Sequence, residues 1–106
     1  MQNVNRIHSL LEMLINEPDD VFLNYALGIE YMTISDFKQA EIQFKKVLNL
    51  NTNYIATYYQ LGKLLEAQTR IIEALEFYNI GLEKAKQVKN NKAINEFNEA
   101  IFILSE

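Results

Sequence analysis

The sequence predicts an all-α protein, a solenoid of paired helices with a capping helix at each end. Two segments superimpose at one constant shift, so that Leu27-Gly28 returns as Leu61-Gly62 and Ala40 returns as Ala74, each 34 positions later. A fixed period of this size is typical of repeat architectures, in which each unit is one supersecondary element stacked on its neighbour. Apolar residues recur at helical spacing between polar turns, and no segment has the apolar–polar alternation of a half-buried strand.

The first predicted helix covers about residues 3–16, where apolar residues recur at helical spacing. Pro18 ends it, because the residue before a proline avoids the α region. Asp19 and Asp20 can then cap a second helix at 21–33. Short polar turns, beginning with Ser35-Asp36, separate the remaining helices. These are predicted at 37–49, 55–67, 71–87 and 92–104. The stripe of the first helix consists of Val4, Ile7, Leu11 and Leu14.

Gly28 and Gly62 lie in the middle of predicted helices, where glycine costs about 1 kcal/mol relative to alanine. Each follows a leucine, and the two are one period apart. We therefore interpret them as points of close helix contact, where a Cβ would collide with the neighbouring helix. The partner helices are expected to supply small residues beside the glycines and an aromatic ring one turn later. Those residues are Ala40 with Phe44 and Ala74 with Tyr78.

At these residues the sequence resembles the tetratricopeptide repeat family, whose signature places an aromatic residue, Leu-Gly, tyrosine, alanine, phenylalanine and proline at fixed positions within each repeat. The packing positions are Leu27, Gly28, Tyr31, Ala40 and Phe44 in a first repeat at about 21–50, and Leu61, Gly62, Ala74 and Tyr78 in a second at about 55–87. The sequence departs from this signature at three positions. Asn24 replaces the first aromatic residue, Leu65 the tyrosine and Thr52 the closing proline. The resemblance implies a right-handed α-solenoid forming one domain over 1–106, capped by helices at 3–16 and 92–104. The chain is similar to short stand-alone bacterial members.

The helix at 21–33 is apolar on two sides, and such a helix is normally buried. In the tetratricopeptide family the side away from the packing stripe lines a concave groove, so the resemblance implies that a peptide or helix binds there. Tyr25 and Tyr59 are the expected anchors, since tyrosine supplies contact area with a polar tip. One period later the face is more polar. The candidate groove residues are Phe22, Tyr25, Ile29, Met32, Tyr59, Lys63 and Glu66.

Three occupants of this apolar face remain open: a partner protein, a second copy of the chain, or another part of the same chain. The expected function is a non-catalytic protein–protein interaction module, and the alternative is a small structural protein that acts as a homodimer. Some family members bind chaperone tails through lysine and asparagine on this face. Tyr25 and Ile29 stand in those places here, so no chaperone-tail binding is expected. Phe102 and Ile103 lie outside the last apolar stripe, and burial at the cap is expected over an exposed patch.

Composition argues against other classes of function. The chain of 106 residues carries a net charge of −4, which suits neither nucleic acid nor an anionic membrane. Basic residues are interspersed with acidic ones, as in the expected Glu41–Lys45 pair at i, i+4. Without cysteine and with His8 as the one histidine, neither a metal site nor a cofactor is expected. No nucleotide-binding loop or catalytic triad is present, so no enzyme activity is expected. The protein is expected to be cytoplasmic.

Overall fold

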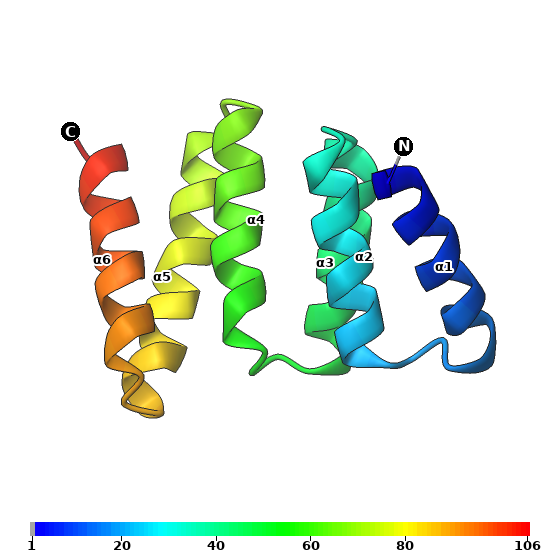
Figure 1. The fold of residues 1–106 in the computed structure, drawn as a ribbon. Helices are drawn as coiled ribbons and strands as arrows, with labels where there is room; N and C mark the ends of the chain where they lie inside the picture. The colour runs from blue at the N-terminus through cyan, green and yellow to red at the C-terminus, as the bar shows by residue number, and fades with distance from the viewer. Residues whose placement is uncertain (1) are drawn as a thin grey trace. The chain divides into compact units, whose positions relative to one another are not determined.

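A computed structural model describes residues 2–106, with side chains from Val4 onward. In this part of the chain six α-helices follow one another and no strand occurs (Figure 1), which confirms the all-α prediction. The helices are α1 (Gln2–Asn16), α2 (Val21–Thr33), α3 (Phe37–Leu50), α4 (Ile55–Ala67), α5 (Ile71–Gln87) and α6 (Asn91–Leu104). These bounds differ from the predicted ones by a single residue at the start of α1, the end of α3 and the start of α6.

The chain divides into two compact units. The first, up to Thr52, holds α1 to α3, and the second, from Asn53, holds α4 to α6. In the first unit α2 packs against both α1 and α3, and in the second α5 packs against both α4 and α6 (Figure 1). Each unit therefore contains one repeat-like helix pair and one additional helix.

Three of the described helices begin with a side-chain cap, and that of α2 was predicted. Asp20 accepts a hydrogen bond from the backbone N–H of Leu23 at 2.8 Å, and Asp36 accepts one from Gln39 at 3.3 Å. Asn90 does the same for α6. Each cap satisfies a backbone donor that the first helical turn leaves without a partner.

Asn24 occupies the family's first aromatic position and has a structural role of its own. Its side chain is buried, and its Nδ2 donates to the carbonyl oxygens of Pro18 at 3.0 Å and Asp20 at 2.8 Å. These bonds tie α2 to the turn that follows α1. A buried amide must be hydrogen-bonded to be tolerated, and here the turn supplies both acceptors.

The helix pairs close around glycines, each facing an aromatic ring. A Cβ built on Gly28 would lie less than 3.0 Å from Phe44, and one on Gly62 less than 3.0 Å from the Tyr78 ring. Gly81, which the repeat shift does not reveal, faces Phe97 of α6 in the same way. In all three cases the aromatic residue follows its glycine by 16 positions. The second unit thus uses one packing device twice, to join α4 to α5 and α5 to α6.

Three helix ends adopt the same left-handed turn without glycine. Ser35, Thr69 and Lys89 have φ of 61°, 57° and 56°, following α2, α4 and α5. After α4, the N–H of Thr69 donates to the carbonyl of Glu66 and that of Arg70 to Leu65, each at 2.9 Å. This is the Schellman arrangement, in which glycine is the usual left-handed residue. Threonine is the least favourable of the three there, because a β-branched side chain crowds the left-handed backbone.

Replacing Thr69 by glycine is therefore expected to stabilise the protein, by about 0.5–1 kcal/mol. Relief of the left-handed strain, worth about 1–2 kcal/mol, exceeds the entropy that glycine adds to the unfolded chain. Urea unfolding followed by circular dichroism measures the change. Thr69→Ala serves as the control, since it removes the hydroxyl and keeps the Cβ. Equal stabilities for the two variants would show that the backbone here is not strained.

The two end helices leave apolar side chains exposed. On α1, Ile7 is buried, whereas Val4 and Leu11 of the same predicted stripe remain exposed. On α6, Phe102 is 68% and Ile103 57% exposed, so the expectation that both are buried is wrong. The reason is that α6 packs through Phe97 and its neighbours on one side only, and no other described helix of its unit covers the opposite side.

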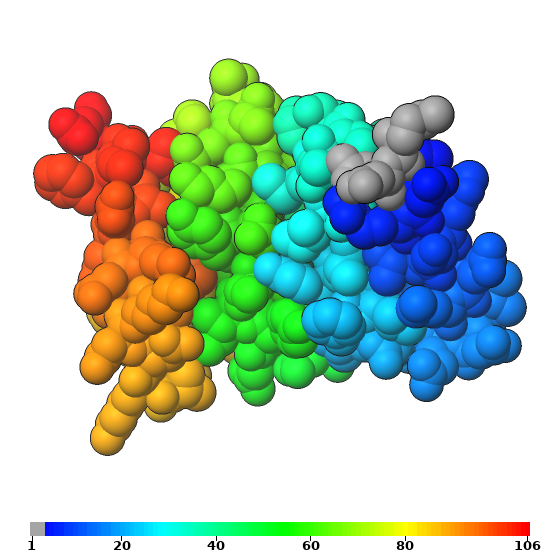
Figure 2. Space-filling model, in the orientation of Figure 1, coloured from blue at the N-terminus to red at the C-terminus, as the bar shows by residue number. Residues whose placement is uncertain are grey.

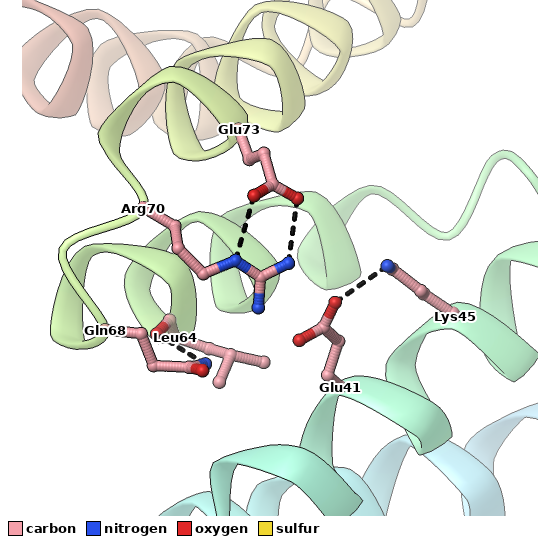
Figure 3. A network of polar contacts seen from close by, with 6 residues as sticks. All are labelled: Glu41, Lys45, Leu64, Gln68, Arg70 and Glu73. Carbon is pink, nitrogen blue, oxygen red and sulfur yellow. Dashed lines mark hydrogen bonds and ion pairs between the residues drawn. The ribbon is translucent and has the colours of Figure 1, made fainter.

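Charged side chains add local support on the surface (Figure 3). The Arg70 guanidinium donates two hydrogen bonds to the Glu73 carboxylate, at 2.9 and 2.8 Å, where α5 begins. The expected pair on α3 is confirmed, with Lys45 Nζ 2.7 Å from Glu41. Surface pairs of this kind contribute about 0.2–1 kcal/mol each, so helix packing dominates the stability.

Candidate functional site

The candidate residues of α2 form one surface of the first unit, here called the α2 face: Phe22, Tyr25, Ile29 and Met32. Phe22 is 65% exposed, and the other three are half-buried. The Tyr25 ring lies 5.8 Å from the Phe44 ring, measured between centroids. Because Phe44 is fixed against Gly28, Tyr25 rests on a rigid base. The α2 face is therefore apolar, aromatic and accessible.

The candidate residues of α4 form a surface of the second unit, here called the α4 face: Tyr59, Lys63 and Glu66. Tyr59 lies 5.9 Å from Tyr78 and 5.8 Å from Phe97 between ring centroids. Tyr78 and Phe97 are themselves 6.3 Å apart, so three helices contribute to one aromatic cluster. Lys63 Nζ lies 5.4 Å from the centre of the Tyr59 ring, within range of a cation–π interaction.

Glu66 is held by a buried tyrosine. The Tyr78 hydroxyl donates a hydrogen bond to Oε2 of Glu66, and the Tyr78 side chain has no exposed surface. Burial, and then the hydrogen bond to Glu66 and its negative charge, raise the pKa of Tyr78 well above its ordinary value of 10.0. Tyr78 therefore stays protonated at physiological pH and remains a donor to the carboxylate.

A hollow of about 180 Å³ lies beside the α4 face, between the beginnings of α4 and α6. On the side of the second unit that Figure 2 displays, α4 (green) and α6 (orange) lie next to each other. The hollow is smaller than the roughly 300–1,000 Å³ typical of small-molecule sites, and its size suits a single side chain. Its lining consists of Ile55, Ala56, Tyr59, Asn90, Lys92, Ala93, Glu96 and Phe97.

The seven candidate groove residues are thus divided between the two units, four on the α2 face and three on the α4 face. The repeat shift does not predict that α6 contributes to the aromatic cluster beneath the α4 face. The spacing from Gly81 to Phe97, which equals that from Gly28 to Phe44, is the signal in the sequence that points to it. His8 is exposed, and no group of three or more potential metal ligands occurs within residues 2–106. None of the helices described is both long and apolar enough to cross a membrane.

Pairs of helices closed by glycine–aromatic contacts, repeated at one fixed period, define a helical-repeat protein. No protein-family model matches the chain. Several solved structures are similar to it. A tetratricopeptide repeat domain protein from Salinibacter ruber, in its crystal structure, is 30% identical over 81% of this chain and 96% of its own, with a TM-score of 0.76. A solution structure of a tetratricopeptide repeat domain protein from the same organism is 31% identical over 82% and 88%, with a TM-score of 0.77. The chain belongs to the tetratricopeptide repeat family.

The same fold occurs at lower sequence identity in the TPR2B domain of yeast Sti1. That structure covers 98% of this chain and 83% of its own at a TM-score of 0.91, with 18% identity. The predicted helical-repeat solenoid is therefore confirmed as the fold class.

Proposed function

We propose that this chain is a non-catalytic protein-interaction module that binds an extended peptide or a helix of a partner protein. The observation that carries the proposal is the α2 face, where Phe22 is largely exposed beside a tyrosine set on a rigid aromatic base. Exposed aromatic side chains with little conformational freedom are typical of binding surfaces, because they add contact area at a low entropic cost.

Proteins of the same fold support this proposal. The Sti1 TPR2B domain is found in complex with pHsp70, and the first TPR of Spaghetti (RPAP3), 23% identical to this chain, is bound to the HSP90 peptide SRMEEVD. We extend to this chain only the class of function, which is recognition of another protein. The single domain over 1–106, the cytoplasmic location and the absence of nucleic-acid partners remain parts of the proposal.

In the proposed mechanism, Tyr25 and Tyr59 are the anchors, and each is supported by aromatic rings of later helices of its own unit. Tyr25 rests on Phe44, and Tyr59 on Tyr78 and Phe97. A ligand would bury the exposed edge of the tyrosine ring on the face that it occupies, and on the α4 face Lys63 and Glu66 would fix its register. Within each unit the helix pair provides the rigid support that keeps its own face preorganised.

A second candidate function is self-association, favoured by the exposed Phe102 and Ile103 on α6. Analytical ultracentrifugation over a range of concentrations separates the two candidates. A structural homodimer would sediment as a dimer and dissociate when Phe102 is replaced by glutamate. A peptide-binding module would remain monomeric, and Phe102→Glu would leave its partner affinity unchanged.

Replacing Tyr25 and Tyr59 together by alanine is expected to weaken partner binding by at least thirtyfold. Loss of a single aromatic anchor commonly costs about 2 kcal/mol, which is roughly thirtyfold in affinity. The partner would first be captured from lysate and identified, and its affinity then measured by calorimetry with purified proteins. Unchanged affinity in the double variant would contradict the proposed surface.

Two controls accompany this experiment. The double variant Ile42→Ala and Ile72→Ala removes exposed apolar side chains that lie outside both faces, and it should bind the partner normally. The peptide SRMEEVD is bound by the first TPR of RPAP3 and should not bind this chain. The family resemblance implies lysine and asparagine at a chaperone-tail site, and Tyr25 and Ile29 stand in those places here. Micromolar binding of that peptide would show that the absence of these residues does not prevent recognition.

A further inference from the structure

Glu66 and Tyr78 differ together from their counterparts in the first repeat. One period earlier the same two positions hold Met32 and Phe44, neither of which carries a group able to form this hydrogen bond. Phe44 packs against Gly28 as Tyr78 packs against Gly62, so a phenyl ring is enough to close the helix pair. The hydroxyl of Tyr78 is therefore not needed for packing. Its hydrogen-bond partner is the carboxylate that appears with it.

The hydrogen bond from Tyr78 engages one carboxylate oxygen of Glu66 and leaves the other available as an acceptor. Tyr78 occupies Oε2, while the half-buried carboxylate retains a second oxygen, Oε1. A carboxylate oxygen beside a fixed partner can accept a charge-assisted bond from a cation, and such bonds are stronger than neutral ones. Tyr78 thus restricts the orientation of Glu66 before any ligand arrives.

The nearest cation along the helix does not neutralise Glu66. Lys63 lies three residues earlier, a spacing at which lysine and glutamate can pair on a helix. Its ammonium group instead lies over the Tyr59 ring. Among the described side chains, none forms an ion pair with Glu66. Glu66 consequently carries a negative charge that no described cation pairs with.

We propose that Glu66 selects a basic side chain, arginine or lysine, in the peptide that this surface binds, with Tyr78 as the positioning residue for the carboxylate. The inference rests on the proposed function, and it adds the chemistry of the partner. The ligand is a segment with a cationic side chain placed to reach Oε1 of Glu66 while an apolar residue lies against Tyr59. This is the opposite charge preference from that of a site for acidic peptide tails.

A library of randomised 12-residue peptides displayed on phage tests the proposal. The wild-type protein is expected to enrich peptides with arginine or lysine at one fixed position relative to an apolar residue. Glu66→Gln keeps an acceptor for Tyr78 and removes the charge, so the affinity for enriched basic peptides should fall about tenfold. Glu66→Lys should reverse the preference toward acidic residues. Glu76→Gln, an exposed carboxylate on α5, is the matched control and should bind as the wild type does.

Tyr78→Phe tests the positioning role separately. Because Phe44 fills the equivalent place, this variant is expected to fold, and circular dichroism verifies that it does. Its selectivity for basic over neutral peptides should fall several-fold, an effect that a purely structural role of the hydroxyl would not produce. Unchanged selectivity would overturn the role of Tyr78.

The outcomes distinguish this inference from the proposed function. Enriched peptides without a preferred basic position, or a preference that survives Glu66→Gln, would overturn the role of Glu66 and leave the peptide-binding function in place. Failure of the wild-type protein to enrich any peptide would overturn both.

Discussion

Replacing Phe97 by alanine is expected to lower the free energy of unfolding by about 3–5 kcal/mol, the range for a fully buried phenylalanine. Phe97 is the largest buried side chain of α6, and Ala100 is the other buried residue of that helix. Its ring fills the space opened by Gly81 and contacts the rings of Tyr59 and Tyr78. The variant would leave a cavity that neither glycine nor the remaining rings can fill.

The same helix supplies a matched control. Phe102→Ala removes an identical side chain that is 68% exposed, and its expected cost is within about 0.5 kcal/mol. Urea unfolding followed by circular dichroism gives both values. Equal losses for the two variants would mean that Phe97 does not anchor α6. Because Tyr59 rests partly on Phe97, the Phe97 variant should also weaken peptide binding, whereas the Phe102 variant should not.

The repeat shift predicted the helix pairs because it compares residues whose role is the same in each copy. Gly28 and Gly62 could be paired with the rings of the partner helices by position alone. Comparison at the repeat shift did not identify Gly81, because Gly81 follows Gly62 by little more than half a period and has no glycine one period away. Its function depends on α6, which begins slightly later than the period would place it. A comparison at one fixed shift cannot identify a contact whose residues do not recur at that shift.

The sequence predicted which residues form the candidate surfaces, but not the residues that support them. Helical spacing identifies which residues share a face of α2 or α4, and this requires only the sequence of that helix. The support beneath Tyr59 comes from α5 and α6, and the partner of Glu66 from α5. Such partners are far apart in the sequence, so the pattern of one helix does not predict them. The exposure of Phe102 was predicted wrongly for a related reason. It depends on which helices lie around α6, and the sequence of α6 alone does not show this.

Replacing Gly62 by alanine is expected to destabilise the protein by about 1–3 kcal/mol, although alanine is the better helix former by about 1 kcal/mol. A Cβ at this position would lie less than 3.0 Å from three atoms of the fully buried Tyr78 ring, so either the ring or the helix must move. Thermal and urea unfolding measure the loss. A stabilised variant would show that α4 and α5 are not in close contact at Gly62.

A double-mutant cycle with Tyr78→Leu separates this steric effect from other causes. Leucine is shorter than tyrosine and leaves room for a methyl group at position 62, although Tyr78→Leu alone should cost about 2–3 kcal/mol for lost burial and contacts. In that background, Gly62→Ala should be neutral or stabilising by up to about 1 kcal/mol, because only the gain in helix propensity remains. The coupling energy between the two positions is then about 2 kcal/mol, within the range for residues in direct contact. Additive losses would mean that the cost at Gly62 does not come from the Tyr78 ring, and the packing role assigned to the glycine–aromatic pairs would be wrong.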